Sequence, residues 1–135
     1  MSDRKTTARA THRRVAAIVL AAGAGTRMNG RVKQLLPWRG KTLIENTINV
    51  ATQSDANETI IVLGAHAEAI RPVVEKMDAR IVVNREWERG HATSIRAGLN
   101  ALAPEIAAAV FINADQPFLT GEVINTLIQR YRSRR

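Results

Sequence analysis

The sequence contains no cysteine among its 135 residues, and only 4% of them are aromatic. The lack of cysteine excludes a disulfide framework and a thiolate metal site, and it fits a cytoplasmic protein. No apolar run reaches the roughly 18 residues that a membrane-spanning helix needs. We therefore expect a single globular domain with an aliphatic core and no membrane partner.

The body of the chain also lacks a charge excess, although the formal net charge is +8. Residues 1–14 contain five basic residues and one acidic residue, and residues 130–135 contain four arginines. The segment between them, residues 15–129, contains eleven basic and eleven acidic residues, so its net charge is zero. We predict a domain at 15–131 between a disordered basic tail at 1–14 and a second basic tail at 132–135. A basic-tailed nucleic-acid-binding protein is the disfavoured alternative.

Arg13-Arg14 followed by the apolar residues 15–23 has the outline of a twin-arginine secretory signal. The alternative is a buried first strand behind a basic tail. We favour the strand because the apolar run is short and continues directly into a glycine-rich loop. Cleavage there would remove the most informative motif of the chain.

Apolar segments alternate with amphipathic segments along the chain. Strands are expected at 15–20, 59–63, 80–83 and 106–112, and helices at 42–52, 68–77, 93–101 and 120–131. This order predicts an α/β fold, a three-layer α/β/α sandwich around a mostly parallel sheet. The polar loops all follow strands, so we expect them to meet at the carboxyl edge of the sheet, where ligands bind.

The loop after the first strand combines Gly23 and Gly25 with Arg27 and Lys33. Glycine lets backbone N–H groups approach a phosphate closely, because no Cβ stands in the way. The two cations would supply positive charge where a triphosphate lies. The loop therefore indicates nucleotide binding.

Two other nucleotide-binding patterns do not fit this region. The dinucleotide fingerprint requires a third glycine where Met28 stands. Gly40-Lys41-Thr42 resembles the end of a P-loop, but Leu35 stands where the first glycine of that loop is required. Thr42 and Glu45 are better explained as a capping box that opens a helix.

Polar residues follow the later strands as well. Asp115 could cap the next helix or bind a divalent cation, and the residues alone leave both roles open. Asn84 could be a turn residue and Ser94 a helix-start residue. His66 and His91 lack the spacing of zinc ligands.

Together these motifs resemble the signature of the nucleotidyltransferase superfamily. The likeness lies in Leu20–Met28, Lys33–Pro37 and Gly40–Leu43. Three later segments are similar to the molybdopterin cytidylyltransferase (MobA/MocA-like) branch: Asn84–Gly90, Ser94–Leu99 and Ala114–Pro117. The resemblance extends from about Val15 to Leu127.

The resemblance implies a Rossmann-like fold of the nucleotide-diphospho-sugar transferase type. It implies an enzyme that transfers a nucleotidyl group, CMP before GMP, from CTP or GTP to a phosphorylated acceptor such as molybdopterin. Pyrophosphate is released, and Mg²⁺ is the implied cofactor. The implied nucleotide-binding residues are Leu20, Ala21, Ala22, Gly23, Gly25, Lys33, Asn84 and Ser94. The implied catalytic residues are Arg27, Lys33 and Asp115, with Asp115 as the metal ligand.

Members of this family continue beyond the helix that follows the Asp115-Gln116-Pro117 motif, with further strands and acceptor contacts. The resemblance therefore implies a C-terminally truncated member. The alternative to an active enzyme is a non-catalytic nucleotide-binding module that a partner, or a second copy in a homo-oligomer, completes.

Overall fold

The computed structural model describes residues 13–24 and 32–134. Its main sheet has four parallel strands in the order β5-β4-β1-β6. These strands are β1 (Arg14–Ala21), β4 (Glu58–Leu63), β5 (Arg80–Val83) and β6 (Ile106–Asn113). Each lies where an apolar run predicts it, within one residue at either end.

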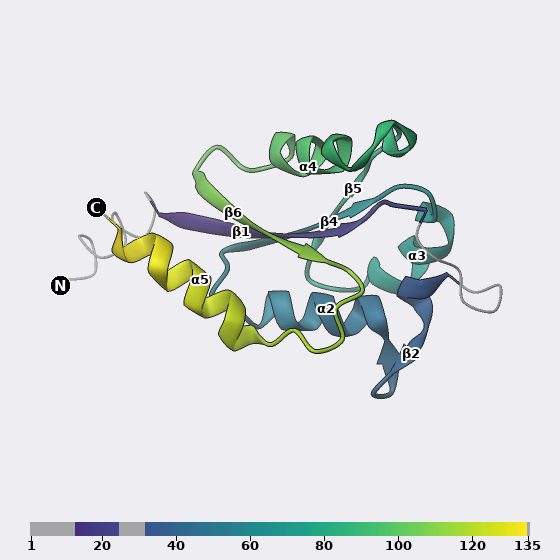
Figure 1. The fold of residues 1–135 in the computed structure, drawn as a ribbon, viewed down its shortest axis with the longest axis horizontal. Helices are drawn as coiled ribbons and strands as arrows, with labels where there is room; N and C mark the ends of the chain where they lie inside the picture. Colours follow the sequence, from purple (N-terminus) through teal and green to yellow (C-terminus); the bar gives the residue numbers. More distant parts are fainter. Residues whose placement is uncertain (1–12, 25–31, 135) are drawn as a thin grey trace.

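Helices cover both faces of the sheet, which confirms the predicted three-layer sandwich (Figure 1). The helices are α2 (Leu43–Thr52), α3 (Ala67–Val74), α4 (His91–Asn100) and α5 (Gly121–Ser133). Helices α2, α3 and α5 pack on one face, and α4 packs alone on the other. The helix α3 ends three residues before its predicted end, and Pro72 lies in its last turn.

Strand β1 lies in the middle of the sheet, and almost all of its residues are buried. Val15, Ala17 and Val19 face the α2–α3–α5 layer, whereas Ile18 and Leu20 face α4. A strand covered on both faces has no solvent side, so its sequence is continuously apolar rather than alternating. This explains the unbroken run that also resembled a secretion signal.

The described part of the segment between β1 and α2 contains short elements that no pattern in the sequence predicts. It contains a 3₁₀ turn, η1 (Lys33–Leu35), and a small hairpin of β2 (Pro37–Trp38) and β3 (Lys41–Thr42). The two hairpin-turn residues, Arg39 and Gly40, have φ angles of 51° and 82°. Two successive residues with left-handed φ angles form a tight turn whose twist matches the twist of the two strands that it connects. Strands of two residues are too short to leave a pattern in the sequence.

The capping box at the start of α2 is present as predicted. The backbone N–H of Glu45 donates to Thr42 Oγ1 at 3.2 Å, and the N–H of Thr42 donates to Glu45 Oε1 at 3.0 Å. Asn46 Nδ2 donates to the carbonyl oxygens of Trp38 and Thr42, at 2.6 and 3.0 Å. The helix start and the hairpin are therefore held together, and they fix the end of the segment that carries Lys33.

The last helix, α5, continues two residues beyond the predicted end at Tyr131. Arg132 Nε donates to the carbonyl oxygen of Arg13 at 3.2 Å, and its Nη2 donates to Asn57 Oδ1 at 2.8 Å. Arg132 thus ties the end of α5 to the start of β1. In the described ranges, no helix is both long enough and apolar enough to cross a membrane.

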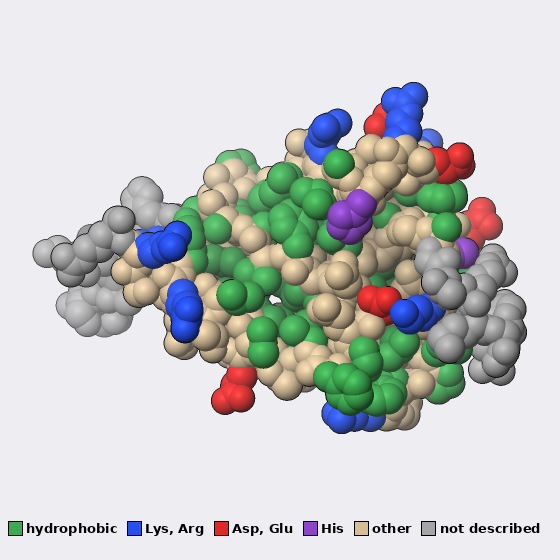
Figure 2. Space-filling view, viewed as in Figure 1, with side chains coloured by type: hydrophobic (Ala, Val, Ile, Leu, Met, Phe, Trp, Pro, Cys, Tyr) green, Lys and Arg blue, Asp and Glu red, His purple; other side chains and the backbone are tan. Residues whose placement is uncertain are grey.

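Strand β6 forms one edge of the sheet, and no described strand pairs with its outer side. Figure 2 shows hydrophobic side chains exposed on this face, from α4 across β6 to α5. Phe111, Val123 and Leu127 are 38%, 50% and 50% exposed. The described residues therefore leave an apolar strip uncovered along β6 and α5.

Candidate functional site

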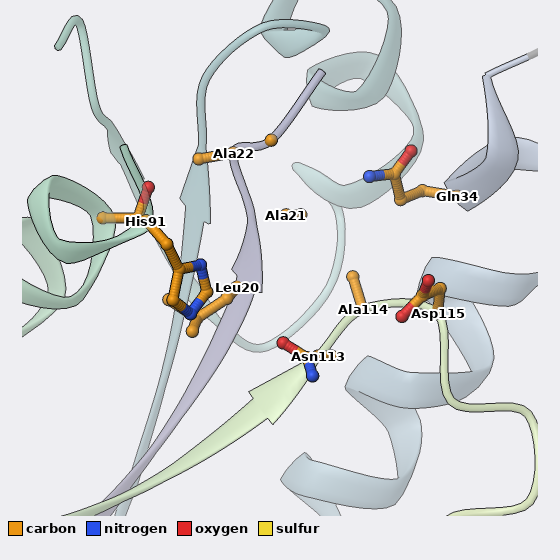
Figure 3. Close-up of a pocket in the computed structure, with 10 residues that line it drawn as sticks. Leu20, Ala21, Ala22, Gln34, His91, Asn113, Ala114 and Asp115 are labelled. Carbon is orange, nitrogen blue, oxygen red and sulfur yellow. The ribbon is translucent and has the colours of Figure 1, made fainter. Parts of the chain in front are cut away.

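A cavity of about 160 Å³ opens at the carboxyl ends of β1 and β6 (Figure 3). Its lining comes from the end of β1, from η1, from the start of α4 and from the end of β6. These residues are Leu20, Ala21, Ala22, Gly23, Gln34, His91, Ser94, Asn113, Ala114 and Asp115. Segments separated by about 90 positions therefore meet at one sheet edge, as the order of strands and loops predicts.

The loop that leaves β1 is held in place from both sides. The N–H of Ala114 donates to the carbonyl oxygen of Leu20 at 3.0 Å, and the N–H of Ala65 donates to that of Ala22 at 2.9 Å. Gly64 packs directly against the loop, because a Cβ on it would lie 2.5 Å from the Ala22 carbonyl oxygen. The turn between β4 and α3 thus fixes the position of the cavity wall.

Lys33 and Asp115 lie together at the mouth of the site. Lys33 Nζ is 3.0 Å from Asp115 Oδ2, and the two side chains are 36% and 37% exposed. One comes from η1 and the other from the loop after β6. An ion pair this exposed contributes little to stability, so its charges remain available to a ligand.

Asp115 does not cap the helix that follows it. Thr120 Oγ1 accepts the N-cap hydrogen bond of α5 from the N–H of Val123, at 3.4 Å. Of the two roles left open by the sequence, the capping role therefore belongs to Thr120.

The described residues contain no cluster of three or more metal-ligating His, Cys, Asp or Glu side chains. Mg²⁺ commonly binds through one or two carboxylates together with substrate phosphates. The single Asp115 carboxylate fits a metal ion of that kind, which shares its ligands with a phosphate substrate. It does not fit an ion enclosed by protein ligands alone.

Asn84 and Ser94 are both 5% exposed and hydrogen-bonded to each other. Asn84 Nδ2 donates to Ser94 Oγ and to Thr93 Oγ1, both at 2.9 Å. Its Oδ1 accepts from the N–H of Glu86, also at 2.9 Å. Ser94 lines the cavity, whereas Asn84 does not. Asn84 therefore positions the start of α4, including Ser94.

Two of the predicted site residues, Gly25 and Arg27, lie outside the described residues. Four residues that line the cavity were not predicted as site residues: Gln34, His91, Asn113 and Ala114. Asn113 and His91 could have been found, because Asn113 directly follows the predicted strand 106–112 and His91 lies two residues before the predicted helix 93–101. Gln34 follows Lys33 in the same turn, but its burial at 8% exposure is a property of the fold alone.

The sequence profile of the MobA-like NTP transferase domain matches residues 17–135. The nicotine blue oxidoreductase of Paenarthrobacter nicotinovorans is 36% identical over 118 residues, which are 87% of this chain and 57% of that protein. The bifunctional protein GlmU of Rhodococcus opacus is 29% identical over 125 residues, which are 87% of this chain and 25% of GlmU.

Solved structures of similar fold are also longer than this chain. The Rv0371c protein of Mycobacterium tuberculosis superposes with a TM-score of 0.79 at 30% identity, over 90% of this chain and 62% of that one. A nucleotidyl transferase from Methanothermobacter superposes with a TM-score of 0.78 at 28% identity, over 86% and 57%. The chain thus spans about 60% of these two structures. Because the family profile covers nearly the whole described fold, the chain belongs to the MobA-like NTP transferase domain family.

Proposed function

We propose that this chain binds a nucleoside triphosphate, CTP before GTP, and transfers its nucleotidyl group to a phosphorylated acceptor such as molybdopterin. The observation that carries the proposal is the exposed Lys33–Asp115 pair beside the loop 20–23. An ammonium group and a carboxylate side by side at the cavity suit a metal-bound triphosphate. The ammonium group attracts phosphate oxygens, and the carboxylate attracts the metal ion. Membership in the family supports the same reaction class.

In the proposed reaction, an oxygen of the acceptor phosphate attacks the α-phosphorus of the triphosphate. The new P–O bond replaces the bond to pyrophosphate, which leaves with the electron pair. The backbone of the loop 20–23 and Lys33 would hold the phosphates and offset the negative charge that develops on their oxygens. Mg²⁺, when bound at Asp115, would supply further positive charge to the same oxygens. The reaction then depends on positioning and electrostatics, and it needs no side-chain nucleophile.

A second candidate is a nucleotide-binding module without turnover. The chain spans 57% of the nicotine blue oxidoreductase and 62% of Rv0371c. The cavity lies within this shared part, whereas the unmatched part of the relatives could supply acceptor contacts. Binding and turnover must therefore be measured separately.

Thermal unfolding with nucleotides tests the binding step. We expect CTP with Mg²⁺ to raise the unfolding temperature, because a ligand at 100 times its Kd stabilises the folded state by about 2.7 kcal/mol. GTP tests the choice of base, and NADPH is included because one relative is named an oxidoreductase. The proposal would be contradicted if NADPH alone raised the unfolding temperature, or if none of the nucleotides raised it. Pyrophosphate release from CTP with molybdopterin then separates an enzyme from a binding module.

Replacing Lys33 with methionine is expected to weaken CTP binding roughly tenfold or more, because hydrogen bonds to charged groups contribute about 1.5–3 kcal/mol. The unfolding temperature without nucleotide should hardly change, since the pair with Asp115 is exposed. Titration calorimetry measures the affinity. Lys41→Met is the matched control, because Lys41 is exposed on the hairpin and does not line the cavity. Equal affinities for the two variants would remove Lys33 from the site.

A further inference from the structure

The outer edge of β6 lacks the features that keep an edge strand from pairing with another chain. Edge strands are usually short, charged or interrupted by proline, because their free N–H and C=O groups otherwise accept a further strand. The opposite edge strand, β5, has four residues and begins with Arg80. Strand β6 has eight residues, none of them charged or proline, and its register shift is confined to its start. The described residues thus leave β6 open to a partner strand.

Helix α5 adds an apolar groove to the same face. The helix follows β6 in the chain and runs back beside it in the opposite direction (Figure 1). A shallow groove of about 490 Å³ lies along α5 and is lined by Thr120, Glu122, Val123, Thr126, Leu127 and Arg130. Val123 and Leu127 lie one helical turn apart in this groove, and both are half exposed. An apolar helix face beside an open strand edge is typical of an interaction surface.

The charges of this groove fit a second copy of the same helix. Glu122 lies near its start and Arg130 near its end, about 12 Å apart along the helix axis, with Thr126 midway. When two copies of α5 pack antiparallel about Thr126, each Glu122 lies opposite Arg130 of the partner. A parallel arrangement would instead bring like charges together. A two-fold interface places a surface against itself, and this groove is complementary to itself only in the antiparallel arrangement.

We propose that the outer edge of β6 and the groove of α5 form a homodimer interface, with the two-fold axis near Thr126. A two-fold axis perpendicular to the sheet makes the two β6 strands antiparallel and the two α5 helices antiparallel, so one arrangement satisfies both surfaces. Val123 and Leu127 are then buried between the helices. None of the groove residues lines the cavity, so the dimer requires no nucleotide.

Sedimentation equilibrium of the full chain measures the association, and charge substitutions test the arrangement. The wild type is expected to be a dimer. Glu122→Arg should weaken dimerisation roughly tenfold or more, because two attractive contacts become repulsive. Adding Arg130→Glu to that variant should restore most of the lost affinity, since opposite charges then face each other again. Glu68→Arg is the matched control, because Glu68 is also exposed in the first turn of a helix, α3, and lies outside the groove.

The lack of cysteine in the chain allows a second readout that depends on geometry. Thr126→Cys places one thiol near the proposed two-fold axis. Mild oxidation should therefore link two chains, because a disulfide requires Cα atoms within about 7 Å of each other. Glu68→Cys is the control and should form far less linked dimer. Denaturing gel electrophoresis without reductant measures the linked fraction.

Three results would overturn the inference. If the wild type remained a monomer at its highest soluble concentration, the face would be covered by something other than a second copy. If Glu122→Arg left the dimer unchanged, or the double variant did not restore it, the dimer would use another surface. Equal linkage of Thr126→Cys and Glu68→Cys would show random collision rather than a two-fold axis at α5. The cysteine variants decide the question even if Glu122→Arg fails to fold.

Discussion

Replacing Gly64 with alanine is expected to lower CTP affinity by about a hundredfold, although Gly64 does not line the cavity. An alanine Cβ would lie 2.5 Å from the Ala22 carbonyl oxygen, 2.8 Å from Ala22 Cβ and 2.9 Å from Trp87 Cβ. The first of these atoms is backbone, so it can move only if the loop that forms the cavity wall moves with it. Overpacking of this kind typically costs about 1–3 kcal/mol of stability.

Gly121→Ala is the matched control for this prediction. Gly121 is the first residue of α5, and a Cβ there would have no other atom within 4 Å. Alanine in a helix is more favourable than glycine by up to about 1 kcal/mol, so this variant should be equally or more stable and bind CTP normally. Thermal unfolding and calorimetry on both variants measure the contrast. Wild-type affinity in Gly64→Ala would show that the loop tolerates displacement and that its position does not determine binding.

Replacing Asp115 with asparagine is expected to reduce pyrophosphate release at least about a hundredfold. The change keeps the size of the side chain but removes the carboxylate charge that would bind Mg²⁺. Metal stabilisation of developing charge contributes several kcal/mol, and each 1.36 kcal/mol is a factor of ten in rate. The folded state should be nearly unaffected, because the ion pair with Lys33 is exposed.

A binding assay keeps this prediction testable if the chain proves to be a module without turnover. The affinity of the wild type for CTP should then rise with Mg²⁺, and that rise should be lost in Asp115→Asn. Asp55→Asn is the control, because Asp55 is exposed in the turn before β4, away from the cavity lining. An Asp115→Asn variant with full turnover and full Mg²⁺ dependence would exclude Asp115 as the metal ligand.

The layers of the fold could be predicted because each depends on a local pattern. The apolar run of β1 is continuous since helices cover both of its faces, and Thr42 with Glu45 shows where α2 begins. Strand direction predicts that Lys33 and Asp115 lie at the same edge of the sheet, because both follow strands of one parallel sheet. These features need only the sequence and the general rules of α/β folds.

The remaining features depend on contacts between distant segments. The hairpin of β2 and β3 depends on a two-residue turn and on hydrogen bonds from Asn46. Asn84 resembles a ligand-binding residue in the sequence, yet its hydrogen bonds go to Thr93, Ser94 and Glu86. The burial of Gln34 accompanies the packing of η1 against α2. No single segment contains that information.

The strand order β5-β4-β1-β6 also has a consequence for how the chain folds during synthesis. β1 is made first but lies between β4 and β6, and its residue Val19 pairs with Ile61 on one side and Ile112 on the other. The second pairing closes a loop of more than 90 residues, and such distant pairings slow folding. During synthesis, the edge of β1 that pairs with β6 therefore has no partner strand until β6 has left the ribosome. We expect the need for chaperones and the expression yield to depend on the time between the synthesis of β1 and the synthesis of β6.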